Sequence, residues 1–302
     1  MRAVRPHHLV LLAPLLALPF AGCAATPAAT DDLQLPAGGV VATLVQPVHD
    51  PAQHADTCKP FHRLFAADGR QLTKDLGGTY PHHRGLFVGW NQVRCAGKTY
   101  DFWHCNHGEW QQVTERRGGG TAPHELTIVW RAADGTPIVH ERRRLAVRDL
   151  HGGSFVCELT SELRAASAEV QLGGDPQHAG CQFRALQQFA EKDQPKVTYV
   201  RPASAKGAAD DVWTDCRWIA ARLPLPDGEV VVLRVEHPDN PRATWSTRPY
   251  GRFGAMCTAT LSSTEPLRLR FAYVIAPEWR FATWGNPPEQ PYEELVGEAF
   301  VD

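Results

Sequence analysis

The sequence predicts an all-β protein, a large antiparallel β-sandwich with one short helix near its C-terminus. Phe155, Cys157 and Leu159 are expected to point to one face, and so are Leu267, Leu269, Phe271, Tyr273 and Ile275, with Arg268 and Arg270 opposite. A period of two is typical of strands with one buried face. About a dozen to sixteen such runs are separated by turn signals. Because no βαβ rhythm and no glycine-rich phosphate loop occurs, antiparallel sheets are the expected architecture.

The expected elements follow one another with short turns between them. Gly118 to Gly120 and the run 149–153 mark two hairpins, and Ala67-Asp68-Gly69 marks a third turn. Only 291–301, with its acidic residues and Leu295, has a helical pattern. The expected strands are 40–48, 61–66, 85–90, 109–116, 124–131, 138–147, 155–163, 181–189, 216–223, 230–236, 253–261 and 267–275.

The N-terminus has the pattern of an export signal. Arg2 and Arg5 precede an apolar run, and small residues stand directly before Cys23. We therefore predict a signal peptide at 1–22, a flexible tether at 23–38 and a single β-sandwich domain at 39–302. A lipid on Cys23 would be the chain's only membrane contact, with ordinary secretion as the alternative. The expected location is the periplasm or cell envelope.

Net charge and cysteine content further limit the possible partners and the cellular compartment. The formal net charge is −2, which excludes an electrostatic footprint for nucleic acid. The chain has 8 cysteines, a content that suits an oxidising compartment. Cys95 and Cys105 flank a glycine-containing turn and are candidates for a disulfide.

Four segments carry polar residues that strands do not require. Each is expected in a loop or at a strand edge, where β scaffolds present functional groups. The segments are 82–85 (His-His-Arg-Gly), 101–108 (Asp-Phe-Trp-His-Cys-Asn-His-Gly), 173–180 (Gly-Gly-Asp-Pro-Gln-His-Ala-Gly) followed by Arg184, and 236–242 (Glu-His-Pro-Asp-Asn-Pro-Arg) followed by Tyr250 and Arg252.

These four ordered motifs resemble a bacterial family of unknown function, the PmoA-like family, often labelled "methane oxygenase PmoA". The resemblance extends from about residue 40 to residue 280. It implies an extracytoplasmic β-protein of the kind found in polysaccharide-degrading bacteria. The fold that it implies is a supersandwich similar to galactose mutarotase.

The first functional hypothesis is an enzyme that performs acid–base chemistry on a sugar or glycoside, as an epimerase, lyase or hydrolase. Histidines exchange protons near neutral pH, so His83 and His178 are the expected proton carriers, with Asp175 as their partner. A small molecule or oligosaccharide is the expected substrate, and all four motifs are expected to line one cleft. The expected substrate-binding residues are His82, Arg84, Trp90, Asp101, Trp103, His107, Arg184, His237, Asn240, Arg242 and Tyr250.

Two alternatives stay open. In the first, several histidines bind copper, zinc or iron, with His104 and His107 as further candidates, because neutral imidazoles suit these metals. No HExxH motif is present, so no metal ligand and no cofactor is assigned from the sequence. In the second alternative the protein is a surface lipoprotein that binds sugar without catalysis.

Overall fold

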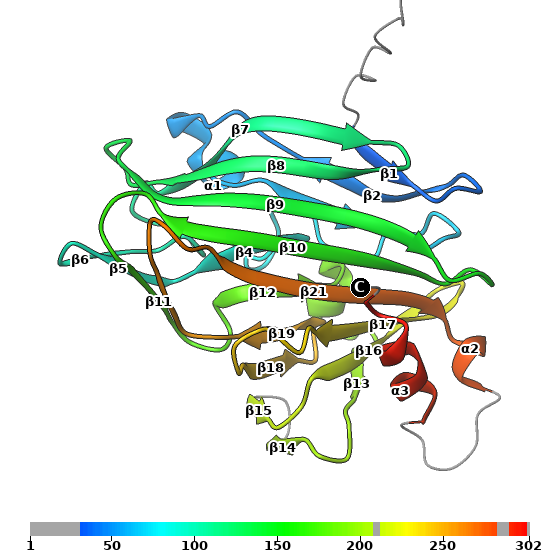
Figure 1. Cartoon of the computed structure of the whole chain (residues 1–302). Coiled ribbons are helices and arrows are strands. Elements are labelled where there is room, and N and C mark those ends of the chain that lie inside the picture. The colour runs from blue at the N-terminus through cyan, green and yellow to red at the C-terminus, as the bar shows by residue number, and fades with distance from the viewer. Residues whose placement is uncertain (1–30, 208–211, 283–289, 301–302) are drawn as a thin grey trace, which may run out of the picture.

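The protein is built almost entirely of β-strands. The computed structural model describes residues 31–207, 212–282 and 290–300, in which 21 strands form three antiparallel sheets (Figure 1). The predicted all-β class is thus confirmed. The signal peptide, Cys23 and the first part of the tether lie outside the described residues.

The first sheet has nine strands and contains segments from both halves of the chain. In spatial order its strands are β1 (Asp32–Gln34), β2 (Val40–Val45), β3 (Phe61–Leu64), β4 (Leu86–Trp90), β12 (Ala179–Arg184), β19 (Arg252–Met256), β18 (Thr244–Arg248), β15 (Val212–Thr214) and β14 (Lys206–Gly207). The pairing of β4 with β12 is important for the site, because it joins segments about ninety residues apart.

The second sheet has eight strands, several of them long. In spatial order they are β13 (Thr198–Val200), β16 (Trp218–Leu225), β17 (Gly228–Glu236), β21 (Leu267–Pro277), β10 (Phe155–Ala165), β9 (Pro137–Asp149), β8 (Ala122–Arg131) and β7 (Trp110–Gly119). The two hairpins expected at 118–120 and 149–153 join β7 to β8 and β9 to β10.

A third sheet and several short helices complete the fold. The sheet consists of β20 (Ala259–Leu261), β11 (Val170–Gly173), β5 (Gln92–Cys95) and β6 (Lys98–Tyr100). The expected C-terminal helix is α3 (Gln290–Gly297). Four one-turn helices were not predicted from the sequence: α1 (His54–Thr57), α2 (Trp279–Ala282), η1 (Pro51–Gln53) and η2 (Gln187–Ala190).

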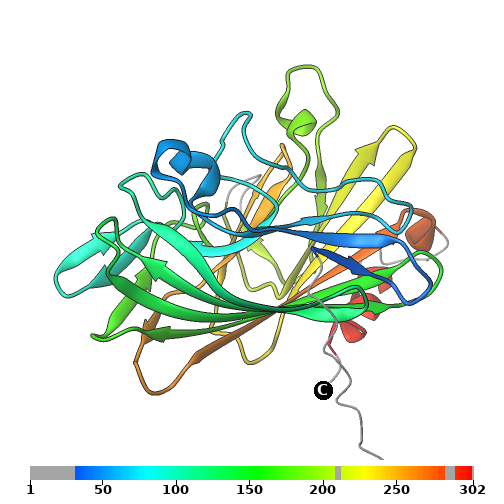
Figure 2. The ribbon, with the colours of Figure 1, turned by 90° about the horizontal axis from the view of Figure 1, so that it is seen from above.

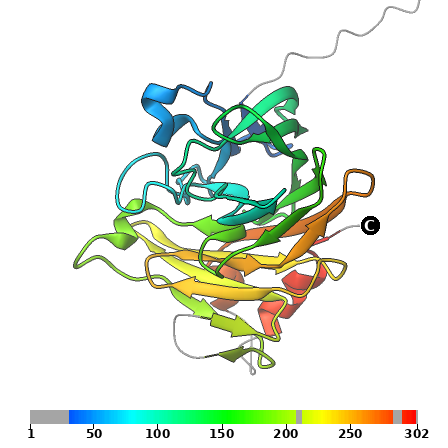
Figure 3. The same cartoon turned by 90° about the vertical axis from the view of Figure 1, so that its left-hand side faces the viewer.

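The main hydrophobic core lies between the nine-stranded and eight-stranded sheets. Figure 2 shows the long green strands as one layer, with the blue and cyan strands on the other side. Inward side chains of both layers, such as Leu86, Phe183 and Leu159, are fully buried there. A second, smaller cluster packs Tyr292 and Leu295 of α3 against the opposite face of the eight-stranded sheet. In Figure 3 α3 (red) lies beside the yellow and orange strands.

Strand β9 corrects the expectation that Glu141 and the three arginines 142–144 are all charges on an exposed strand face. Arg142 and Arg144 point outward and are exposed, whereas Glu141 and Arg143 are buried. The buried pair forms two hydrogen bonds of 2.8 and 2.9 Å. The Glu141 carboxylate also accepts hydrogen bonds from Trp130 and Ser161. Burial without such partners would be very costly for either charge.

The expected tether ends earlier than predicted. Residues 32–34 form β1, which pairs with β2, and Leu33 is only 1% exposed. The proline- and threonine-rich composition of this stretch indicated flexibility, but burial of Leu33 and Leu35 attaches it to the core. No helix among the described residues is long and apolar enough to cross a membrane.

Candidate functional site

Four imidazole rings from three loops meet beside the nine-stranded sheet. His82 and His83 lie in the loop before β4, His104 follows β6, and His178 directly precedes β12. The ring centroids of His82 and His83 are 4.4 Å apart. His104 lies 4.5 Å from His82 and 4.6 Å from His178. The sequence places these residues up to about a hundred positions apart, so the tertiary fold forms this cluster.

Two of the loops are attached to the end of β4. The Phe102 amide donates to the Trp90 carbonyl at 2.9 Å, and the Asn91 amide donates to the His178 carbonyl at 3.0 Å. Gly89 permits the first of these approaches, because a Cβ atom there would lie 2.5 Å from the Phe102 carbonyl oxygen. The absence of a side chain at this position thus brings the His104 loop onto the sheet.

Two of the four histidines are held by aspartates three residues earlier in the chain. His104 Nδ1 lies 2.7 Å from Asp101 Oδ2, and His178 Nδ1 lies 2.9 Å from Asp175 Oδ1. Because an ionised carboxylate only accepts hydrogen bonds, Nδ1 carries a proton in both rings, and the neutral form of each ring has its lone pair on Nε2. Each aspartate is itself fixed by backbone amides of its own turn. Asn91 adds a hydrogen bond of 2.7 Å to Asp175.

The environment keeps three of these imidazoles neutral. Burial, with the neighbouring His104, lowers the pKa of His82 to about 3. Burial also lowers the pKa of His83 far below its ordinary value. For His178 burial outweighs the attraction of Asp175, and its pKa is lowered as well. Neutral imidazoles with free lone pairs are the form that binds metal ions.

Among the four imidazoles of the cluster, the buried nitrogen without a hydrogen-bond partner in the described residues belongs to His82. His82 Nε2 is buried and unpaired, which is unfavourable unless a ligand or ion satisfies it. Trp103 packs beside the rings of His83 and His178, with its centroid 5.7 Å from that of His83 and 6.4 Å from that of His178. Its side chain is fully buried, so it supports the cluster from the interior.

Buried cations hold the loops that carry the histidines. Lys59 donates to the Trp103 carbonyl, and Lys74 donates to the His83 carbonyl at 3.1 Å. Arg84 donates to carbonyls of helix α1. Burial lowers the pKa of Lys59 and lowers that of Lys74 to about 8. These cations oppose protonation of the imidazoles beside them.

The structure brings together five residues that the sequence analysis assigned to one site: His82, His83, Asp101, Asp175 and His178. Arg184 and Tyr250 lie close by. The Arg184 guanidinium carbon is 4.7 Å from the centre of the Tyr250 ring, and Tyr250 stacks on Tyr80 at 5.3 Å.

Three other expected contacts are corrected. Trp90 and Trp103 were expected to present flat faces to a substrate, but both are fully buried. The Trp90 indole donates to the Cys257 carbonyl within the core. Arg84 is 1% exposed and binds backbone carbonyls. Trp and Arg side chains can pack or donate hydrogen bonds in the protein interior as well as to a ligand. Residue type alone therefore does not distinguish these two roles.

His107 lies at the surface. Its side chain is 78% exposed and its Nδ1 is 3.6 Å from Glu109. Unlike His104, it shows no ring contact with the histidine cluster among the described residues.

Residues 236–242 of the fourth segment do not share the cleft that was expected, unlike Tyr250, which follows them in the chain. His237, Asn240 and Arg242 line a cavity of about 720 Å³ that contains no described residue of the other three motifs. His237 follows β17 of the eight-stranded sheet, and its Nε2 accepts a hydrogen bond from Arg270 at 2.7 Å. Asn240 is bound to Glu236. Attachment to a different sheet separates this motif from the histidines.

His104 was not among the residues expected to carry protons or bind substrate. It was considered only for the metal alternative, yet it contacts both His82 and His178. The missed signal is a repeat, since Asp101-x-x-His104 and Asp175-x-x-His178 have the same spacing. In both, the aspartate closes a turn and orients the histidine three residues later.

The expected pairing of Cys95 with Cys105 is not observed. The cysteines of the described residues are free thiols, and Cys105 hydrogen-bonds instead with Cys58. Cys105 follows His104 directly, so this contact packs the His104 loop against the segment after α1.

Comparison with known proteins gives a family and no activity. The model of a family described as "Family of unknown function (DUF6807)" matches residues 33–281. No curated protein matches the sequence. A solved structure from human microbiome, provisionally named a kojibiose phosphorylase, is similar with 8% identity and a TM-score of 0.34. The match covers 87% of this chain but only 30% of that one, so the likeness carries no functional weight.

Proposed function

The chain belongs to DUF6807, a family of unknown function. From the histidine cluster we propose that it is a transition-metal enzyme. His82, His83 and His178 bind the ion, and the substrate is a sugar or another polyhydroxylated molecule. This differs from the metal-free acid–base hypothesis that the sequence favoured.

One observation carries the proposal. One ligand atom from each of His82, His83 and His178 lies within 4.8 Å of the other two. Tetrahedral bonds of about 2.1 Å place donors about 3.4 Å apart, so the three rings must turn toward one another when an ion binds. Asp175 behind His178 is the arrangement by which carboxylates orient metal-binding histidines. The unpaired His82 Nε2 supports the same conclusion.

The donor set indicates the class of metal. Neutral imidazole nitrogens suit zinc, copper, iron and nickel. Three protein ligands leave a coordination position open, as in catalytic rather than structural sites. When bound, such an ion polarises a substrate oxygen and makes bound water more acidic.

A metal-free mechanism fits the geometry less well. His83 is 2% exposed, and burial holds its pKa far below neutrality, so it is a poor proton carrier. His104 and His178 are both held by aspartates, but with ring centroids 4.6 Å apart no sugar ring fits between them. We assign His104 as the proton carrier beside the metal, oriented by Asp101.

The substrate class is supported by the surroundings of the cluster. Tyr80 is 45% exposed, and its ring centroid lies 6.3 Å from those of His82 and His83. An exposed aromatic face next to polar groups is suited to the C–H face of a sugar. Export and a lipid on Cys23 remain part of the proposal, and mass spectrometry of the mature N-terminus tests both.

Metal titration tests the centre directly. Protein stripped with a chelator is titrated with Zn²⁺, Cu²⁺ and Co²⁺ by calorimetry, and the Co²⁺ form is examined for the visible bands of nitrogen ligation. We expect one ion per chain, and His82→Ala or His178→Ala to weaken binding by about 100-fold or more. His107→Ala, on the surface, is the matched control.

The proposal fails if the wild type binds none of these ions stoichiometrically. It also fails if both alanine variants bind as tightly as His107→Ala. A substrate screen with the loaded protein then separates an enzyme from a protein that only binds sugar, because His104→Ala should abolish turnover and leave metal affinity nearly unchanged.

A further inference from the structure

In the part of the chain that the structure describes, only one of the three guanidinium nitrogens of Arg184 has hydrogen-bond partners. Its Nη1 atom donates to the carbonyls of Ala185 at 3.0 Å and Tyr250 at 2.5 Å. Its Nε and Nη2 atoms are buried and have no hydrogen-bond partner among the described residues. The side chain is 1% exposed, so water does not readily replace the missing partners. Unpaired donors of a buried cation are unfavourable and call for an explanation.

The two unpaired atoms define one edge of the guanidinium group. Nε and Nη2 point in parallel, and this edge binds a carboxylate through two hydrogen bonds. Because Nη1 is fixed by two carbonyls, the edge is held in position before any ligand arrives. No ion pair of Arg184 occurs within the described ranges, and burial lowers its pKa to about 10.

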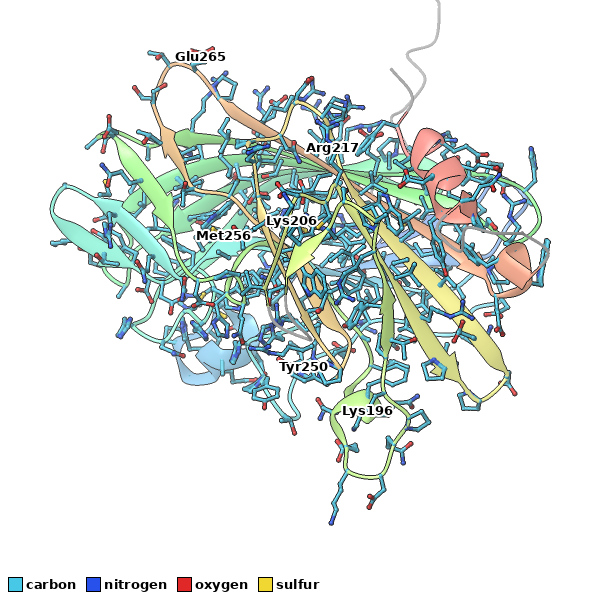
Figure 4. All side chains as sticks on the ribbon, turned by 90° about the horizontal axis from the view of Figure 1, so that it is seen from below. Lys196, Lys206, Arg217, Tyr250, Met256 and Glu265 are labelled. Atoms are coloured by element: carbon cyan, nitrogen blue, oxygen red, sulfur yellow. The ribbon has the colours of Figure 1, made fainter. Side chains whose placement is uncertain are left out.

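The rings of Tyr250 and Tyr80 lie between Arg184 and the histidine cluster. The Arg184 guanidinium carbon is 4.7 Å from the Tyr250 ring centre, and Tyr250 stacks on Tyr80. Tyr80 in turn contacts the rings of His82 and His83. Figure 4 shows Tyr250 on the side of the molecule from which the loop with Lys196 projects.

Of these two rings, that of Tyr80 is the one most easily displaced. Tyr80 has a φ of 58°, a left-handed conformation that is unfavourable for a residue with a side chain. Tyr80 is 45% exposed, whereas Arg184 and Ala185 are buried. Rotation of Tyr80 toward solvent therefore disturbs little packing.

The charges around the site have the same sign as Arg184. Lys59, Lys74 and Arg252 are buried, and burial lowers the pKa of each. The nearby carboxylates of Asp101 and Asp175 are already engaged by histidines. An anion that enters this region is attracted by every one of the cations.

We propose that the substrate of the histidine centre carries a carboxylate, which binds the Nε–Nη2 edge of Arg184 when the stacked rings of Tyr80 and Tyr250 move aside. With a sugar as the substrate, the ligand class is a uronic acid or a glycoside of one. This inference rests on the proposed function for its reaction, but the carboxylate site itself does not require the metal.

Calorimetry with D-glucuronate and D-glucose tests the proposal on metal-loaded and metal-free full-length protein. We expect the wild type to prefer glucuronate by about tenfold or more, which is the size of effect of a charge-assisted pair. Arg184→Lys keeps the charge but lacks the two-donor edge, and should lose most of this preference. Arg242→Lys, an exposed arginine in the separate cavity, should retain it.

A second variant changes the exposed ring without altering Arg184. Tyr80→Ala should keep the preference for glucuronate over glucose, because the two-donor edge of Arg184 is unchanged. The proposal is overturned if the wild type does not distinguish the two sugars, binds neither, or if Arg184→Lys prefers glucuronate as the wild type does. If Arg184 controls the preference but no metal binds, the carboxylate site stands and the proposed metal function falls.

Discussion

The imidazole Nδ1 of His178 lies 2.9 Å from Oδ1 of Asp175 and 3.0 Å from its Oδ2. The carboxylate thus sets both the tautomer and the direction in which Nε2 points. Asp101 does the same for His104. Burial opposes ionisation of Asp175, yet the hydrogen bonds from His178 and from its own turn lower its pKa. Asp175 is therefore ionised at neutral pH.

Asp175→Asn should weaken metal binding by about 10–100-fold. The amide keeps the size of the side chain but attracts the imidazole Nδ1 proton less and permits the wrong tautomer. Calorimetric titration with Zn²⁺ measures the change. Asp149→Asn is the control, because Asp149 lies 3.6 Å from the exposed His151 elsewhere in the fold. Equal affinities of the two variants would contradict the role given to Asp175.

Acid should destabilise the metal-free protein from about pH 6.5 downward. In the unfolded chain the histidines have a pKa of about 6.5, whereas burial lowers the pKa of His82 to about 3 and also lowers the pKa of His83 well below its ordinary value. Between these values the unfolded state binds more protons, so the free energy of unfolding falls as pH falls. The stability that the two neutral histidines permit is fully present above pH 6.5.

Urea unfolding at a series of pH values measures this dependence. His82→Gln should reduce the slope of unfolding free energy against pH by up to one proton, since it removes one titrating group. His151→Gln, whose imidazole is 92% exposed, should leave the slope unchanged. A slope that is the same in all three proteins would show that His82 titrates normally.

Glu141→Gln should destabilise the sandwich by about 3–5 kcal/mol, because it leaves the Arg143 charge buried without its partner. Both side chains are completely buried in the native protein. Glu162→Gln on the adjacent strand removes only a surface pair with Arg268 at 3.7 Å and should cost less than about 1 kcal/mol. Chemical denaturation of the two variants decides whether the buried pair has this role.

Gly180→Ala should be more harmful than Gly228→Ala. Both glycines have positive φ, 80° and 105°, which costs an alanine about 1–3 kcal/mol. At Gly180 a Cβ atom would also lie 2.3 Å from the Ala255 carbonyl oxygen, whereas nothing lies within 4 Å at Gly228. Thermal unfolding gives the order of stability. Because Gly180 follows His178 by two residues, only its variant should also weaken metal binding.

Much of the fold was predictable from local pattern. Alternation along 155–163 and 267–275 matches β10 and β21, which pair in register over their length. The glycine-rich stretches at 118–120 and 149–153 form the hairpins expected of them. The boundaries were less accurate, and the strand expected at 181–189 ends at Arg184, where Leu186 and Phe189 turn into the core.

The candidate site was predictable in part. A motif rich in histidine and aspartate identified His82, His83, Asp175 and His178. It did not separate them from His237, whose motif has the same composition but binds Arg270 at another cavity. Composition reports which groups are present. It does not report which strand carries a loop or which sheet that strand joins.

The sequence by itself determined the all-β class, the positions of most turns and the short list of side chains able to do chemistry, because these follow from local periodicity and residue type. Only the tertiary structure decided that His82, His83, His104 and His178 share one centre and that Trp90, Trp103 and Arg143 are interior. Those outcomes depend on the pairing of β4 with β12 and on burial between sheets. Both are long-range contacts, and a period of two gives the face of a strand but not its neighbour.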